Sequence, residues 1–242
     1  MKLTVRVHLI RHAEVASHRG DVTITPGGRL AAEELGRRLA EETAPGERLA
    51  YGFAPTRRAR ETVDAVAAGL GEGARRKGGT LSTAQGPWEL FGLRNPDVYL
   101  GGVRVEMVSS AEAFAEQTAC VGVGAAEVRE SPFFAEFLQA PDRIGYWVAH
   151  RAPPGEDADA VAGRMLTFLG SLGALSPDVS RLIAVTHSGP MRAFLRRYLL
   201  GHDPGEPEYV ERIDLEVGAQ GQVSVAFRGL RRSIAAAPGA FE

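Results

Sequence analysis

The sequence has 242 residues, 44% of them hydrophobic and 24% charged, which predicts one globular domain spanning residues 1–242. Its formal net charge of -2 argues against a broad surface for nucleic acid or for a membrane, because binding to such polyanions requires an excess of positive charge. The single cysteine, Cys120, excludes an intrachain disulfide and a cysteine-based metal cluster.

The N-terminal segment predicts a strand. Val5, Val7 and Leu9 alternate with polar residues, and the pattern ends near Arg11. The segment lacks the long apolar stretch and the cleavage site of a signal peptide, and no part of the sequence reaches the ~18 consecutive apolar residues of a membrane span. We therefore expect a cytoplasmic protein without a membrane partner.

Helices and strands then alternate along the chain. Apolar periodicity and capping residues predict helices at about 26–42, 56–70, 155–172 and 189–200, and strands at 49–53, 81–84 and 182–186. A hairpin is expected at 209–217 and 222–227. Such alternation is typical of an α/β fold, here a three-layer α/β/α sandwich with a mainly parallel sheet and an antiparallel edge.

Residues 91–150 interrupt this alternation. The stretch contains Asn95-Pro96 and Gly101-Gly102, and its regular parts are two expected helices at about 110–118 and 132–139. We interpret the whole stretch as a helical insertion that lies over the core and over the functional site.

Two of the predicted strands end next to a histidine. One precedes Arg11 and His12, and the strand at 182–186 precedes His187. Ligand sites in open α/β sheets form outside the carboxyl ends of the strands, so we expect both histidines at one edge of the sheet. A neutral imidazole can attack phosphorus while arginines hold the equatorial oxygens of the phosphoryl group. The pattern therefore favours phosphoryl transfer.

Four segments, in this order along the chain, resemble signatures of the histidine phosphatase superfamily, also called the phosphoglycerate mutase-like family. They are LIRHAE at 9–14, APTRRARET at 54–62, PGED at 154–157 followed by Arg164, and VTHSG at 185–189. The resemblance implies that His12 becomes phosphorylated and that Arg11 and Arg58 bind the phosphate. It also implies that His187 is the second histidine against the phosphate.

The resemblance further implies a carboxyl group that protonates the leaving oxygen and then activates water. In the family this acid usually follows the strand that corresponds to residues 81–84, and Glu89 is the best match. Asp97 and Glu106 are the reserve candidates. Family members often contact substrate through the loop after the first signature, which makes His18 a further substrate-binding candidate.

Neither a metal nor a cofactor is expected. The six histidines are scattered without the helical spacing of a zinc site, and arginines already supply the positive charge that a metal would bring. The sequence also contains no glycine-rich nucleotide-binding loop. The expected partner is a small phosphorylated substrate, and the sequence leaves a homodimer open.

Within the family the choice lies between a mutase and a phosphatase. Phosphoglycerate mutases carry a long segment, W-N-x-x-x-R-F-x-G-W-x-D, after the first signature, whereas this chain passes quickly from residues 15–21 to the helix that Thr25 begins. We therefore predict a phosphoric monoester hydrolase for a sugar phosphate, a nucleotide or a similar small metabolite. The alternatives are a mutase and a non-catalytic scaffold for phosphorylated ligands. The presence of both histidines and both arginines argues against the scaffold.

Overall fold

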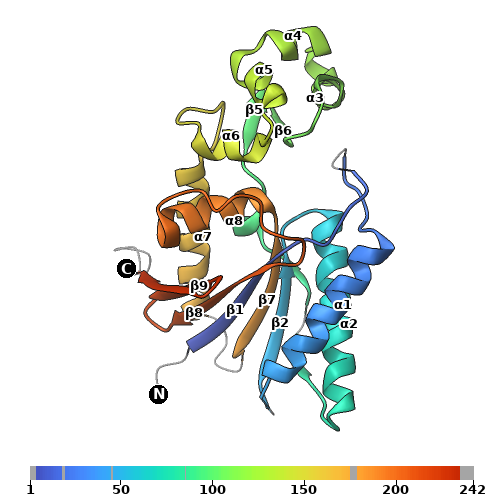
Figure 1. Cartoon of the computed structure of the whole chain (residues 1–242), viewed down its shortest axis with the longest axis vertical. Helices are drawn as coiled ribbons and strands as arrows, with labels where there is room; N and C mark the ends of the chain where they lie inside the picture. The colour runs from blue at the N-terminus through green and yellow to red at the C-terminus, as the bar shows by residue number, and fades with distance from the viewer. Residues whose placement is uncertain (1–3, 18–19, 45, 85, 175–178, 235–242) are drawn as a thin grey trace.

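The computed structural model describes residues 4–17, 20–44, 46–84, 86–174 and 179–234. Its centre is an eight-stranded sheet in the order β10-β9-β8-β1-β7-β2-β3, with β4 also paired to β2 (Figure 1). The strands of this sheet are β1 Thr4–Arg11, β2 Arg48–Phe53, β3 Ser82–Thr83, β4 Trp88–Glu89, β7 Arg181–Thr186, β8 Arg212–Gly218, β9 Val223–Phe227 and β10 Leu230–Ile234.

The directions of the strands confirm the predicted α/β class. β1, β7, β2, β3 and β4 pair in parallel, whereas β8, β9 and β10 form an antiparallel edge on β1. The predicted hairpin corresponds to β8 and β9, and β10 extends it by a strand that the sequence pattern did not indicate. The strand predicted at 81–84 corresponds to β3, which is only two residues long. β4, also two residues long, comes after it in the chain and pairs with β2 as well.

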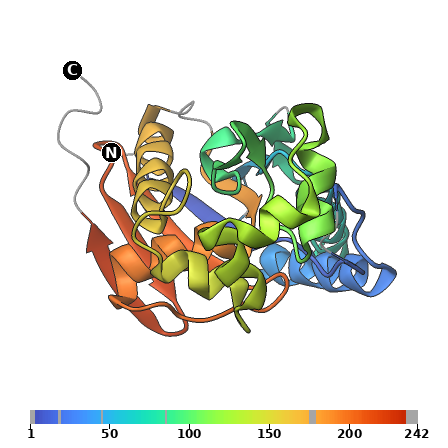
Figure 2. The ribbon, with the colours of Figure 1, turned by 90° about the horizontal axis from the view of Figure 1, so that it is seen from above.

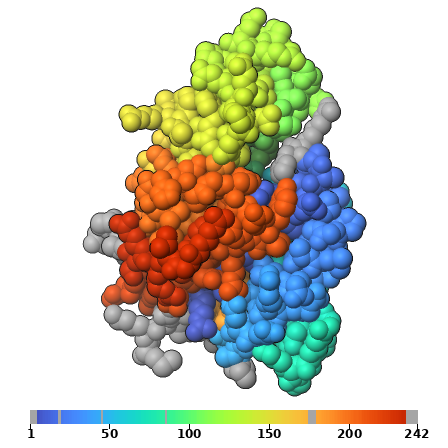
Figure 3. Space-filling model, viewed as in Figure 1, coloured from blue at the N-terminus to red at the C-terminus, as the bar shows by residue number. Residues whose placement is uncertain are grey.

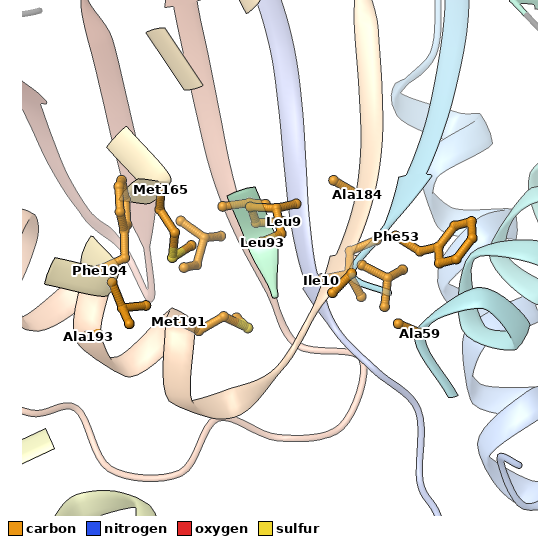
Figure 4. Packing of buried hydrophobic residues seen from close by; sticks show 14 of the residues in the cluster. Leu9, Ile10, Phe53, Ala59, Leu93, Met165, Ala184, Met191, Ala193 and Phe194 are labelled. Carbon is orange, nitrogen blue, oxygen red and sulfur yellow. The ribbon is translucent and has the colours of Figure 1, made fainter. Parts of the chain in front are cut away.

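Helices cover both faces of the sheet. Successive residues of a strand point to opposite faces, so a strand that is apolar throughout has side chains to bury on each face. Figure 4 shows Leu9 among Met165 and Phe194 on one face, while the next residue, Ile10, points toward Ala59 on the other. All five side chains are completely buried. Full burial of a leucine, isoleucine, methionine or phenylalanine side chain contributes roughly 1.5–3 kcal/mol.

Four helices form the outer layers, and three of them begin at side-chain caps. They are α1 Pro26–Glu42, α2 Arg57–Arg76, α7 Ala158–Ser171, with the 3-10 turn η3 Leu172–Ala174 after it, and α8 Ser188–Leu195, which continues as the π-helix η4 Arg196–Leu200. Thr25, Thr56 and Asp157 each accept a hydrogen bond from a backbone N–H in the first turn of α1, α2 and α7. No helix in the described part of the chain is both long and apolar enough to cross a membrane.

The glycine-rich stretch 71–79, which the sequence predicts to be a turn, is mostly a continuation of α2. Gly73 of this stretch, together with Gly69 before it, permits the close crossing of α1 and α2. A Cβ on Gly69 would collide with the carbonyl oxygen of Glu33, and a Cβ on Gly73 would lie 2.6 Å from that of Ala40. The absence of a side chain thus permits helix contact here rather than chain reversal.

Residues 91–150, which we call the cap, lie beyond the carboxyl ends of the parallel strands (Figures 1 and 2). Figure 3 shows the upper part of the cap as a separate lobe above the core. Its elements are η1 Phe91–Leu93, β5 Val98–Leu100, β6 Val103–Val105, α3 Ala111–Gln117, η2 Ala119–Val121, α4 Ala125–Glu130, α5 Pro132–Gln139 and α6 Arg143–Ala149. The two helices predicted here are α3 and α5, and buried phenylalanines of both, such as Phe114 and Phe134, pack against each other.

Candidate active site

Arg11 and His12 lie where β1 ends, beside the end of β7. The two strands are parallel with Arg11 opposite Thr186, and the backbone N–H of His12 donates to the Thr186 carbonyl at 2.9 Å. His187 directly follows Thr186. The rings of His12 and His187 are 5.4 Å apart between centroids, inclined by 62°, and each residue is 3% exposed. Parallel pairing therefore brings the two predicted histidines together.

A hydrogen bond determines which nitrogen of His12 is available for chemistry. Nδ1 lies 2.8 Å from the carbonyl oxygen of Ala13, which can only accept, so Nδ1 carries the proton and Nε2 keeps its lone pair. The loop is held in turn by Thr62, whose hydroxyl accepts from the Ala13 N–H at 2.9 Å and donates to the Arg58 carbonyl at 2.7 Å. The nucleophile predicted from sequence is thus oriented by the start of α2.

Arg58 lies in the first turn of α2 and is 9% exposed. Burial lowers the pKa of its guanidinium, an effect opposed by the carboxylates of Glu106 and Asp21. Within the described residues its buried Nε has no hydrogen-bond partner. A buried guanidinium is costly unless an opposite charge accompanies it, so this environment suits a bound anion.

Arg11 is held by the segment that precedes β8. Its guanidinium pairs with Glu206 at 2.6 Å, donates to the carbonyl of Pro207 and lies 4.1 Å above the ring centroid of Tyr209. Tyr209 also contacts His12, with 5.9 Å between ring centroids. The Nε of Arg11 is buried and has no partner among the described residues, which leaves one donor for a ligand.

Sequence reasoning missed the residues that support Arg11. Glu206 also accepts from the hydroxyl of Ser188 at 2.5 Å and lies 3.3 Å from the completely buried Arg192. Arg192 is paired with Asp142 of the cap and with Asp203. Hydrogen bonding by Arg192 lowers the pKa of the Asp142 carboxyl. Isolated charges in a loop give no periodic signal, so only the fold reveals this network.

Three adjoining cavities surround the histidine–arginine cluster, which we define as Arg11, His12, Arg58 and His187. The central cavity, of about 80 Å³, is lined by all four residues. A second cavity, of about 410 Å³, shares His187 with it. The third, of about 730 Å³, shares Arg58. Both larger cavities are bounded on one side by the cap, so a ligand at the cluster would contact cap residues.

A family model described as the histidine phosphatase superfamily (branch 1) matches residues 7–91 and 122–217. The chain belongs to the histidine phosphatase superfamily. The matched residues include all four members of the cluster, and the unmatched stretch between them lies within the cap. A comparison with curated proteins gave no match.

Solved structures resemble this member of the superfamily over nearly its whole length. A phosphoglycerate mutase from Bacillus anthracis is 14% identical, with 90% of each chain covered and a TM-score of 0.52. An Escherichia coli protein with the proposed activity of an alpha-ribazole-5'-P phosphatase is 16% identical, covering 94% of this chain and 96% of its own, with a TM-score of 0.50. A protein described as mycobacterial hydrolase 1 is 16% identical, covering 96% and 97%, with a TM-score of 0.50. At these identities the likeness shows the fold.

The structure separates the candidate proton donors of this superfamily member. Glu89 is exposed at the end of β4 and lines none of the three cavities, so it is not brought to the cluster. Asp97 lines the second cavity but is hydrogen-bonded by Arg94 and Arg104, which lower the pKa of its carboxyl to about 2. A carboxyl held ionised in this way is a poor proton donor.

Glu106 lies at the junction of the two larger cavities. One of its carboxylate oxygens accepts from the amide of Asn95 at 2.7 Å, and the other pairs with Arg104 at 3.0 Å. Asn95 itself lines the central cavity together with His12. Of the three carboxyl groups that the sequence offered as the acid, Glu106 is therefore the one that connects to the cluster, through Asn95. Sequence reasoning missed Asn95 as a site residue, because a neutral amide carries no catalytic signature.

Two remaining predictions concern His18 and a metal. His18 lies outside the described residues, although Gly20 and Asp21 after it line the largest cavity. Across the described ranges, no group of three or more histidine, cysteine or acidic side chains could hold a metal ion. The positive charge in the cluster comes from Arg11 and Arg58.

Proposed function

We propose that this protein is a phosphatase that hydrolyses a small phosphomonoester through a phosphohistidine on His12. The observation that carries the proposal is the position of His12, with its Nδ1 hydrogen-bonded to the Ala13 carbonyl, in a cavity that Arg11, Arg58 and His187 also line. Membership in the histidine phosphatase superfamily supports it. Among the structural neighbours, one is named as a mutase and one has a proposed phosphatase activity, so the neighbours agree with either reaction.

In the first step, the lone pair of His12 Nε2 attacks phosphorus and the bond from phosphorus to the ester oxygen breaks. The electron pair of that bond goes to the leaving oxygen, which takes a proton from a carboxyl group. Arg11, Arg58 and His187 stabilise the equatorial oxygens as charge accumulates on them. The product is an alcohol and a phosphorylated His12.

In the second step, the same group, now a carboxylate, removes a proton from water, and the water oxygen attacks phosphorus. The bond between phosphorus and His12 Nε2 breaks, and its electron pair returns to the nitrogen. Inorganic phosphate leaves, and the carboxyl group is again protonated for the next cycle. We assign this carboxyl group to Glu106, because it lines both larger cavities and is held by Asn95 at the edge of the central one.

The test is phosphate release from a panel of phosphomonoesters by the wild-type chain, His12→Ala and a control, His202→Ala. His202 is exposed, and its Nδ1 contacts only the local carbonyl of Leu200 among the described residues, so its removal should not affect turnover. We expect His12→Ala to abolish both turnover and the acid-labile phosphoenzyme. Transfer to a second hydroxyl without phosphate release would identify a mutase. Phosphate binding without phosphoenzyme or turnover would identify a scaffold.

A further inference from the structure

The segment between η4 and β8 brings a carboxylate to the central cavity. Glu206 lies on this segment and lines the cavity together with Arg11 and His12. Its two carboxylate oxygens have different partners. Oε1 pairs with the Arg11 guanidinium at 2.6 Å, whereas Oε2 accepts from the Ser188 hydroxyl at 2.5 Å and lies 3.3 Å from Arg192. Glu206 thus connects the end of β1 with the start of α8.

A carboxylate is an unexpected neighbour for a bound phosphate. Two negative groups in one cavity repel each other, and the charge of Glu206 offsets part of the attraction between Arg11 and a ligand. Glu206 would therefore weaken the site unless it contributed in another way. Orientation of Arg11 is such a contribution, because a long side chain loses much rotamer freedom when it is fixed and phosphoryl transfer depends on accurately placed cations.

Three contacts hold the guanidinium of Arg11. Its Nη1 donates to the Pro207 carbonyl, its Nη2 pairs with Glu206, and the ring centroid of Tyr209 lies 4.1 Å from its central carbon. Its Nε is buried and has no partner among the described residues. Because a guanidinium is planar and rigid, fixing both terminal nitrogens also fixes the direction of the Nε–H. Of these three contacts only the one with Glu206 is an ion pair, so we expect it to contribute most to the orientation.

A buried arginine holds Glu206 in turn. The side chain of Glu206 is 47% exposed, and without a partner in the core it could rotate into solvent. Arg192 is completely buried, and its guanidinium donates hydrogen bonds to Asp142 of the cap and to Asp203. These bonds fix the Nη1 of Arg192 beside Oε2 of Glu206. A fixed arginine thus orients the carboxylate that pairs with Arg11.

We propose that Glu206 is a positioning residue, which directs the guanidinium of Arg11 toward the phosphate. In this role it acts through Arg11 and transfers no proton to the ester. The gain from a correctly placed cation exceeds the repulsion between the carboxylate and the phosphate. The effect on turnover rests on the proposed phosphatase activity, whereas the effect on phosphate binding requires only that the cluster binds an anion.

The test measures the Kd of inorganic phosphate and kcat/KM for p-nitrophenyl phosphate. We expect Glu206→Ala to raise Kd and to lower kcat/KM, each by at least about tenfold, because the ion pair with Arg11 is lost. Glu206→Gln should recover most of this loss, since its amide oxygen can accept from Arg11 while its NH₂ group donates to the Ser188 hydroxyl. The matched control is Glu208→Ala, at an exposed position of the same segment that lines none of the three cavities, and it should change neither quantity. Unchanged or tighter phosphate binding in Glu206→Ala would overturn the inference.

A double-mutant cycle with Arg11→Ala separates positioning of Arg11 from a general effect on the fold. In the Arg11→Ala background, Glu206→Ala should change Kd and kcat/KM by no more than about twofold, because the group that Glu206 orients is absent. A further tenfold loss in that background would show that Glu206 acts independently of Arg11 and would contradict the inference. If the wild-type chain releases no phosphate from p-nitrophenyl phosphate, the proposed phosphatase is wrong, and the comparison of Kd values still decides the role of Glu206.

Discussion

At the scale of single residues, two hydrogen bonds define the chemistry of the site. The Ala13 carbonyl holds the proton of His12 on Nδ1, which makes Nε2 the atom that we propose attacks phosphorus. The amide of Asn95, which lines the central cavity, donates to Glu106, the carboxyl group that we propose as the acid. In the proposed mechanism these two hydrogen bonds would hold the nucleophile and the acid in fixed positions, as positioning catalysis requires.

The assignment of the acid predicts a dependence on the leaving group. Glu106→Gln should reduce kcat/KM for an alkyl phosphate by roughly 10²-fold or more, because an alkoxide needs a proton as it leaves. The loss for p-nitrophenyl phosphate should be much smaller, since nitrophenolate leaves without protonation. Steady-state rates of both esters with both proteins provide the measurement.

Glu89→Gln is the matched comparison, because it makes the same chemical change at the position that the sequence pattern favours. Glu89 is exposed and lines none of the three cavities, so this variant should keep wild-type rates on both esters. A leaving-group-dependent loss in Glu89→Gln, with Glu106→Gln unaffected, would restore the assignment made from sequence.

The sequence could predict the cluster but not its surroundings, and the reason is physical. His12 and His187 each follow a strand, and parallel strands end at the same edge of the sheet, so their proximity follows from local pattern alone. Asn95, Glu106 and Glu206 reach the site through irregular chain whose path no periodicity specifies. Their positions therefore required the fold.

At the scale of elements, the crossing of α1 and α2 matters because α2 carries Arg58 and Thr62. We expect Gly69→Ala to lower the free energy of unfolding by about 1–3 kcal/mol. The added Cβ would collide with the backbone carbonyl of Glu33, which cannot move without shifting α1. Chemical denaturation of the variant and the wild-type chain measures the difference.

Gly71→Ala on the same helix is the control. A Cβ at Gly71 would meet only the end of the Arg75 side chain, at 3.5 Å, so the higher helix propensity of alanine should raise stability by about 0.5–1 kcal/mol. The two substitutions are chemically identical and are expected to have opposite signs. Equal effects of the two would contradict the close crossing of the helices.

These glycines also explain where element prediction failed. Glycine in a polar stretch usually indicates a turn, so the sequence pattern ended the helix near residue 70, whereas α2 runs to Arg76. The information that a glycine faces a neighbouring helix lies in the tertiary structure. The central strands were predictable because apolar runs buried on both faces, such as 182–186, have few alternative structures.

At the scale of the whole molecule, the cap is joined to the core by ionic groups. Arg164 of α7 pairs with Glu156 at 2.9 Å and donates to the carbonyl of Gly92 at the start of the cap. Glu156 also accepts from the N–H of Asp97, whose own side chain is held by the arginines at 94 and 104. The fold of the cap near this attachment, and with it the shape of the cavities that the cap bounds, should therefore depend on pH.

Asp97→Asn tests this dependence. Hydrogen bonds from Arg94 and Arg104 lower the pKa of the Asp97 carboxyl from 3.8 to about 2, so its ionised form stabilises the fold above pH 3.8 and loses this effect as pH falls toward 2. Near pH 7 the variant should melt about 2–4 °C below the wild-type chain. This difference in Tm should shrink between about pH 4 and pH 2. The control is Asp64→Asn, which removes an exposed partner of Arg60 and should differ little from the wild-type chain in Tm at any pH. A difference for Asp97→Asn that stays constant down to pH 2 would mean that the carboxylate does not secure the cap.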